Sequence, residues 1–166
     1  MNALRSVTYL SVALAGFLWL APAPGGPLAA DLPSYSQATR LYDSGRVVEA
    51  AKIFRRLARA GNAMAQVSLA GILENGDLPT GRNMSEAASF YRKAARSGNP
   101  VAQMNLGEML AEGRGVARDR VAAWVWLKRS AENGRSWAAR RLERLEREMT
   151  PVERREGRAR YRNRLQ

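Results

Sequence analysis

Apolar positions along the chain recur at the spacing of a helix rather than in strict alternation. In residues 49–61, Ala50 and Ile53 lie three positions apart on one helical face, and residues 86–98 and 122–134 repeat this arrangement. Charged side chains occupy the intervening positions, so each stretch predicts an amphipathic helix with one buried face. Ala, Leu and Arg are abundant whereas Val, Ile and Thr are sparse. The sequence therefore predicts an all-α fold with almost no sheet.

The helical pattern itself repeats about every 36 residues, a period typical of stacked helix pairs. The string AGNAMAQVSLAGILENG, residues 60–76, matches SGNPVAQMNLGEMLAEG, residues 97–113. Each string places small and large apolar residues at i, i+4 and i+8, the pattern of one buried face. We therefore expect an α-α solenoid of helix-turn-helix repeats, because each pair buries its apolar face only against its neighbours.

Turn and capping residues punctuate the pattern where these helices are expected to start and stop. Glycines that can adopt a left-handed conformation follow each second helix, at Gly61, Gly98 and Gly134. Residues with capping side chains precede the expected helices, at Asn62, Asn83, Asn99, Asp119 and Thr150. Asn83 with Glu86 and Thr150 with Glu153 have the three-residue spacing of a capping box.

These signals divide the chain into three predicted parts. Residues 1–30 form a signal peptide, residues 31–149 the helical repeat domain, and residues 150–166 a basic C-terminal helix. The repeat domain is predicted to contain units at about 34–62, 63–99 and 100–135, followed by a capping helix at 136–149.

The N-terminal segment is typical of a secretory signal. Arg5 is its only charged residue, and the apolar run that begins at Thr8 is followed by small and turn residues up to Ala30. The run of about 15 residues is shorter than the roughly 20 that a membrane-spanning helix needs. We expect cleavage after Ala30 and a periplasmic or secreted protein; an uncleaved N-terminal anchor in the inner membrane is the alternative.

Most of the chain after residue 30 resembles the Sel-one-like repeat family, which is related to the tetratricopeptide repeats, and the units at about 63–99 and 100–135 carry the resemblance most clearly. The unit that fits the family's pattern best carries it at Ala102, Leu106, Gly107, Leu110, Gly113, Gly115, Val116, Asp119, Ala123, Trp126, Ala131 and Gly134. The resemblance implies an exported bacterial adaptor that binds other proteins on the concave surface lined by the first helix of each pair. It implies neither a particular partner nor an oligomeric state.

The composition removes most catalytic and metal chemistry from consideration. The chain contains no Cys and no His, so it lacks thiolate nucleophiles, imidazole bases and the usual ligands of zinc. Glu108 and Glu112 share a helix face and could in principle act as an acid–base pair, but we interpret them as a solvated edge. No phosphate-binding glycine loop is present. We predict no catalytic, cofactor-binding or metal-binding residue and no cofactor, and keep a hydrolase acting on envelope substrates only as a remote alternative.

Candidate partner-binding residues come from three places in the sequence. Helix-face reasoning assigns Gln66, Gln103 and Asn105 to the first helices of their pairs, and Trp124 and Trp137 are bulky where earlier units have Ala88 and Val101. Each Trp has two interpretations, packing beneath the C-terminal helix or anchoring a partner. The remaining candidates are arginines: Arg140, Arg141, Arg144, Arg154, Arg155 and Arg158.

The charge supports a second hypothesis for function. The chain carries a net charge of +12, and residues 135–166 hold eleven Arg and five Glu, a net of +6. Such a segment could bind polyanionic envelope material, either exopolysaccharide or anionic lipid, although a solvated arginine-rich surface has the same composition. A secretory signal and the absence of interleaved aromatic residues argue against nucleic acid as the partner.

Overall fold

The computed structural model describes residues 34–163, and all regular structure in this part of the chain is helical. The expected all-α solenoid is therefore confirmed. The predicted signal peptide, residues 1–30, lies outside the described residues. Within residues 34–163, no helix combines the length and apolar content needed to cross a bilayer.

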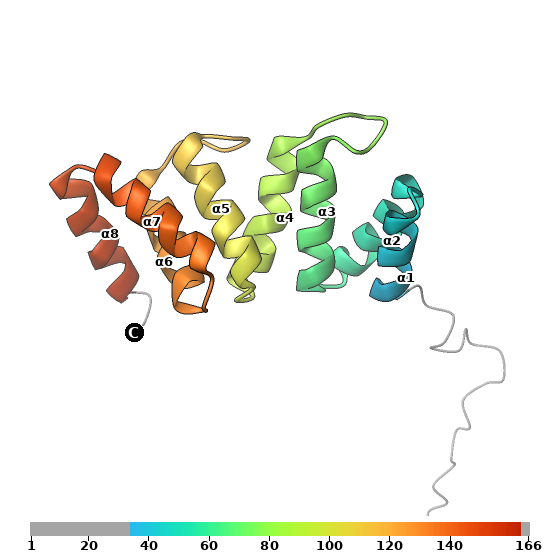
Figure 1. The fold of residues 1–166 in the computed structure, drawn as a ribbon, viewed down its shortest axis with the longest axis horizontal. Helices are drawn as coiled ribbons and strands as arrows, with labels where there is room; N and C mark the ends of the chain where they lie inside the picture. Colours follow the sequence, from blue (N-terminus) through green and yellow to red (C-terminus); the bar gives the residue numbers. More distant parts are fainter. Residues whose placement is uncertain (1–33, 164–166) are drawn as a thin grey trace, which may run out of the picture. The chain divides into compact units, whose positions relative to one another are not determined.

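Eight helices make up the described part of the chain and follow one another as antiparallel pairs (Figure 1). They are α1 (Tyr35–Asp43), α2 (Val47–Arg59), α3 (Ala63–Asn75), α4 (Met84–Arg96), α5 (Pro100–Glu112), α6 (Arg120–Glu132), α7 (Ser136–Glu148) and α8 (Pro151–Asn163). We call α1, α3, α5 and α7 the A helices, and α2, α4, α6 and α8 the B helices. From α1 to α7 each helix packs against the next, and α8 packs against α6.

The predicted caps explain where the A helices α3 and α5 begin. The side-chain oxygen of Asn62 accepts a hydrogen bond from Ala65 N at 2.9 Å, and that of Asn99 accepts one from Ala102 N at 3.0 Å. Each bond satisfies one of the N–H groups that a helix start leaves without an intrahelical partner. The turn before each cap passes through a glycine with positive φ, 91° at Gly61 and 87° at Gly98.

The predicted caps of the B helices also form. Asn83 accepts from Glu86 N, and Asp119 accepts from Ala122 N at 2.8 Å. At the start of α8 the capping box is reciprocal, because Glu153 N donates to the Thr150 hydroxyl and Thr150 N donates to the Glu153 carboxylate. Local sequence signals therefore set these helix starts.

Alanines at repeated positions let the helices approach closely. Ala50, Ala87 and Ala123 occupy equivalent places on successive B helices, and each is fully buried. Phe90 and Trp126 fill the next equivalent position and are buried as expected. In the first repeat the equivalent Ile53 is only partly buried, whereas the next position, Phe54, is buried like its counterparts Tyr91 and Leu127.

The docking of α8 depends on a glycine that the sequence analysis did not single out. A Cβ on Gly157 would lie 3.1 Å from the ring of Trp124, so the backbone of α8 rests directly on that indole. The Tyr161 ring meets the same indole edge-on, with centroids 6.2 Å apart. Trp124 is 4% exposed, so of its two interpretations packing beneath α8 is confirmed and contact with a partner is wrong.

Candidate binding surface of the A helices

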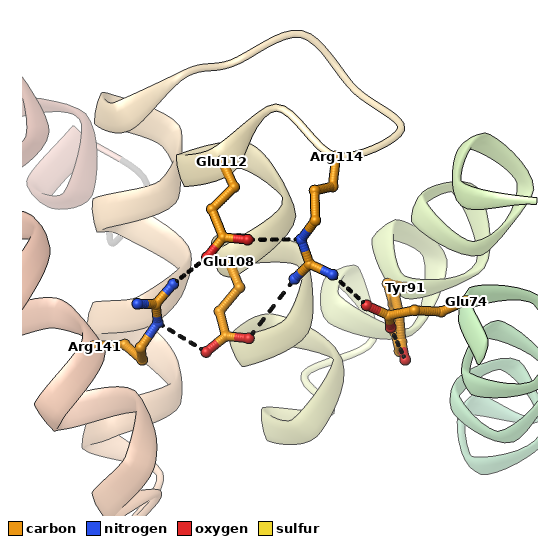
Figure 2. A network of polar contacts seen from close by, with 6 residues as sticks. All are labelled: Glu74, Tyr91, Glu108, Glu112, Arg114 and Arg141. Atoms are coloured by element: carbon orange, nitrogen blue, oxygen red, sulfur yellow. Dashed lines mark hydrogen bonds and ion pairs between the residues drawn. The ribbon is translucent and has the colours of Figure 1, made fainter.

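An ion-pair network joins three successive A helices (Figure 2). Arg114, in the loop that follows α5, reaches back to Glu74 at the end of α3, with Nη1 2.7 Å from the carboxylate. Its Nε also lies 2.7 Å from Glu112 on α5, and Nη2 lies 4.0 Å from Glu108. One guanidinium thus ties a loop of one repeat to the A helix of the repeat before it.

Arg141 extends the network to α7. Its Nε donates to Glu108 at 2.9 Å, and its Nη2 donates to Glu112 at 2.5 Å. Both carboxylates therefore lie between two arginines, as Figure 2 shows. The interpretation of these residues as a solvated edge holds for Glu112, whose side chain is 45% exposed, and is corrected for Glu108, which is 26% exposed; both carboxylates pair with guanidinium groups.

The buried end of the network is the phenol of Tyr91, on the B helix α4. Its hydroxyl donates to Glu74 at 3.0 Å. Burial, reinforced by the Glu74 carboxylate, raises the pKa of Tyr91 well above its usual value, so the phenol stays neutral. Burial opposes the charge of Arg114, but Glu74 and Glu112 more than compensate, and the pKa of Arg114 is also raised. Arg114 therefore stays charged and Tyr91 stays neutral across the ordinary pH range.

Three hollows lie along the A helices beside this network. The first, between α1 and α3, has a volume of about 180 Å³ and includes Gly71 and Asn75. The second has about 470 Å³ and includes Asn75, Glu74 and Arg114. The third has about 430 Å³ and includes Glu112, Arg141 and Arg144. Asn75 lines the first two, and the network connects the second to the third. We call this run of hollows the A-helix groove.

Two of the helical repeats match a known protein family. The family model described as Sel1 repeat matches residues 63–99 and 100–134. A solved Sel1 repeat protein from Oxalobacter formigenes is 31% identical, with a TM-score of 0.60, over 66% of this chain and 84% of that one. The chain belongs to the Sel1 repeat family.

A second solved structure extends the Sel1 likeness. It is a protective antigen present in uropathogenic Escherichia coli strains, which displays an SLR fold, and it is 26% identical with a TM-score of 0.70. The match covers 78% of this chain, which spans only 28% of the antigen's length. The search of curated proteins finds no match. Sel1 repeats generally act as scaffolds for protein interaction.

Two predicted contacts on these Sel1 repeats are corrected, because Gln66 and Gln103 are each only 4% exposed. The Gln66 amide donates to the backbone oxygen of Ala58, and the Gln103 amide donates to that of Ala95. Both oxygens belong to the last turn of the preceding B helix, where carbonyls lack intrahelical donors. Each glutamine therefore caps the C-terminal end of the B helix in the preceding Sel1 repeat, and neither is available to a partner.

Other predicted residues remain accessible. Asn105 is half-buried on α5, and Arg141 and Arg144 line the third hollow. Trp137 is 67% exposed at the start of α7, with the Arg140 guanidinium 4.5 Å from its ring centroid. This pair stands at the surface of the last A helix rather than beneath α8.

The C-terminal arginines divide into two groups. Arg154 donates to the backbone oxygens of Glu146 and Met149, so it closes the end of α7 and holds α8 beside it. Arg155 and Arg158 are exposed on α8, and Arg162 follows on the same helical face. Among the described residues, none of these three forms an ion pair with a carboxylate.

Sequence reasoning missed Glu74, Arg114 and the α1–α3 hollow. One signal was present, because Glu108 and Glu112 replace Gly71 and Asn75 of the preceding repeat, so a departure from the Sel1 pattern marked the network. Its arginine partners come from a loop and from another repeat. Within residues 34–163, no group of three or more metal-ligating side chains is close enough to hold an ion.

Proposed function

We propose that this protein is an exported bacterial scaffold that binds a segment of a partner protein along the A-helix groove. The observation that carries the proposal is the run of connected hollows, which crosses all four A helices and links through Asn75 and the ion-pair network. An extended segment of about nine residues is about 30 Å long, at about 3.3 Å per residue, so it would reach along more than one of these hollows.

The lining favours a protein segment over a small cofactor. Cofactor pockets are lined mainly by apolar side chains. The second hollow is lined by Glu74, Asn75, Arg82, Met84 and Arg114, four of which are polar or charged. The third hollow adds Arg118, Arg141 and Arg144 beside Glu112 and Glu148. Alternating charges of this kind suit the backbone and side chains of a peptide.

The export part of the proposal is supported by the signal-like sequence of residues 1–30, and it is tested separately from the groove. N-terminal sequencing of the protein isolated from the producing cells should find Asp31 first, as expected from cleavage after Ala30. If the isolated protein retains Met1 and remains in the inner-membrane fraction, the N-terminal segment is an uncleaved anchor. The groove proposal does not depend on which of the two is found.

A matched pair of variants tests the groove. Crosslinking in the native envelope followed by mass spectrometry supplies the partner, whose affinity is then measured by calorimetry. Asn75→Trp places a bulky ring where the first two hollows meet. Ser89→Trp adds the same ring at an exposed position of the B helix α4. We expect Asn75→Trp to weaken binding at least tenfold and Ser89→Trp to leave it unchanged; equal affinities would refute groove binding.

A second candidate function is favoured by α8. Arg155, Arg158 and Arg162 share one face and lack carboxylate partners among the described residues, which suits a polyanion such as exopolysaccharide or anionic lipid. Deletion of residues 150–166 would be a poor test, because it would also uncover Trp124.

Three arginine-to-glutamine changes test this candidate with the fold intact. The variant R155Q/R158Q/R162Q is compared with R40Q/R59Q/R96Q, which removes the same charge from exposed positions elsewhere. The probes are vesicles containing phosphatidylglycerol and a soluble polyuronate. Selective loss of binding in the α8 variant supports this function, and equal loss in both variants reduces it to an effect of net charge.

A further inference from the structure

Gly71 is a glycine that neither the backbone nor the packing of the fold requires. It lies inside α3 with ordinary helical torsions, and the nearest atom to an added Cβ is the Tyr91 hydroxyl oxygen, at 3.9 Å. Gly107 on α5 is different, because a Cβ there would lie 2.8 Å from Leu127. Glycine inside a helix is destabilising relative to alanine. We therefore look for a function of Gly71 other than stabilising the fold.

Gly71 forms one wall of the hollow between α1 and α3. The other lining residues are Tyr35, Thr39, Tyr42, Phe54, Ser68, Ile72 and Asn75. The volume of about 180 Å³ exceeds the roughly 150 Å³ that accommodates benzene in an engineered cavity. It is smaller than the roughly 300 Å³ at which pockets for drug-sized ligands begin. The hollow therefore fits one bulky side chain.

The chemistry of the hollow selects an apolar occupant. Tyr35 and Phe54 stand at its side with ring centroids 5.4 Å apart. Its polar groups already bond within the protein: the Tyr35 hydroxyl pairs with that of Ser68 at 2.9 Å, and the Thr39 hydroxyl donates to Tyr35 O. An apolar side chain can enter without breaking these bonds or leaving them unmet.

A carboxylate stands beside the mouth of the hollow in a chain of net charge +12. Asp77 accepts hydrogen bonds from the hydroxyl of Tyr42 and the amide of Asn75, two residues that line the hollow. The bond to Asp77 raises the pKa of Tyr42. Asp77 forms no ion pair with an Arg or Lys of residues 34–163, so it is available to a positive charge on a bound segment.

We propose that the α1–α3 hollow receives one aromatic or branched aliphatic side chain of the partner segment, and that Asp77 contacts a basic residue next to it. Gly71 determines this specificity by leaving the hollow open. The equivalent position in the next repeat is Glu108, which carries a long side chain that joins the ion-pair network. The inference rests on the proposed groove function and names the chemistry that the groove recognises.

Capped nonapeptides of random sequence, displayed as an array, are the probe for this proposal. The full chain is compared with Gly71→Leu, which fills the hollow, and with Ser89→Leu, which adds the same side chain on α4. Peptides bound by the unmodified chain should share a Phe, Tyr, Trp, Leu or Ile beside a Lys or Arg. Their affinity should fall at least tenfold in Gly71→Leu and stay within twofold in Ser89→Leu.

Further measurements separate a binding role from a folding defect. Gly71→Leu should melt no lower than the unmodified chain, because space surrounds the added side chain. Asp77→Asn should weaken the binding of peptides that carry Lys or Arg and leave the affinity of neutral peptides unchanged. Two results would overturn the proposal. If the unmodified chain self-associates and Gly71→Leu does not, the hollow binds a second copy of this chain. If the unmodified chain binds a synthetic peptide of residues 22–33 and Gly71→Leu does not, the hollow binds the chain's own N-terminal segment.

The outcomes also distinguish this inference from the proposed function. Peptides that bind the unmodified chain and Gly71→Leu equally well, yet are lost in Asn75→Trp, would overturn the role of the hollow and leave the groove function standing. If the bound peptides share no bulky apolar residue, the role of the hollow is likewise overturned and the groove function stands. If no peptide binds and the native partner is indifferent to Asn75→Trp, both proposals fail.

Discussion

Gly107 faces Leu127 so closely that an added Cβ would lie 2.8 Å from Leu127 Cγ and 3.3 Å from the backbone oxygen of Ala123. The A helix α5 therefore touches the B helix α6 through its backbone. In the preceding repeat the equivalent residue is Ala70, which is fully buried, so the α3–α4 crossing accommodates a methyl group. Successive Sel1 repeats of this chain thus differ in how closely their two helices approach.

This difference predicts opposite effects of the same substitution at two helical glycines. Gly107→Ala should overpack the α5–α6 crossing and cost about 1–3 kcal/mol. Gly71→Ala meets nothing closer than 3.9 Å and should stabilise the protein by about 0.5–1 kcal/mol through helix propensity. Urea unfolding followed by circular dichroism measures both. A stabilising Gly107→Ala would show that the crossing can relax.

Arg114→Ala should loosen the contact between consecutive repeats. The substitution removes the partner that Glu74 and Glu112 share, and Arg114 is 37% exposed, so solvent already weakens these ion pairs. We expect a loss of about 1 kcal/mol at low salt. The loss should shrink in 1 M NaCl, where the Debye length is about 3 Å.

Arg46→Ala is the matched control for that measurement. Arg46 pairs with Glu49 on the same helix turn, and both side chains are at least half exposed. Removal of such an exposed pair should leave the free energy of unfolding almost unchanged. Equal effects of Arg46→Ala and Arg114→Ala would mean that the network contributes nothing beyond an ordinary surface ion pair.

The docking of α8 should weaken in acid. The hydrogen bond from Tyr161 lowers the pKa of Glu132, and the bond from Thr150 N lowers the pKa of Glu153. A carboxyl whose pKa is lowered by folding stabilises the fold above its usual value of 4.5 and loses that effect as the pH falls below it. Protection of residues 151–163 against hydrogen exchange, measured relative to the intrinsic exchange rate at each pH, should therefore fall below pH 4.5 before protection in α3 and α5 does.

Glu132→Gln/Glu153→Gln provides the control for this pH dependence. With both carboxylates removed, protection in α8 should already be lower at pH 7 and should vary less between pH 5 and pH 3. An unchanged pH profile in the double variant would assign the acid sensitivity to other carboxylates. The same data report whether α8 opens separately from the repeats or together with them.

The sequence predicted the features that local chemistry determines. Asn62 and Asn99 cap their helices, and Gly61 and Gly98 close the preceding turns, because each depends only on a few neighbouring residues. The repeated alanines were also predictable, since a period in the sequence imposes the same packing on each unit.

Features that depend on contacts between repeats were not predictable in the same way. Gln66 shares a helix with accessible residues, yet it turns inward to a carbonyl of the preceding B helix. Glu108 reaches Arg141 on another helix, and Arg114 reaches Glu74 from a loop, so neither contact has a local signature. Gly157 carries no side chain at all, and only the position of Trp124 explains it.

Site-specific photo-crosslinking in cells distinguishes the A-helix groove from the B helices as the partner-binding surface. Benzoylphenylalanine replaces Arg82 or Arg144, which line the second and third hollows, or it replaces Lys52 or Ser89, which are exposed on the B helices α2 and α4. If the partner binds in the groove, positions 82 and 144 crosslink the same protein after irradiation, while positions 52 and 89 do not. Crosslinking of that protein from positions 52 and 89, with none from 82 and 144, would place the binding surface on the B helices instead.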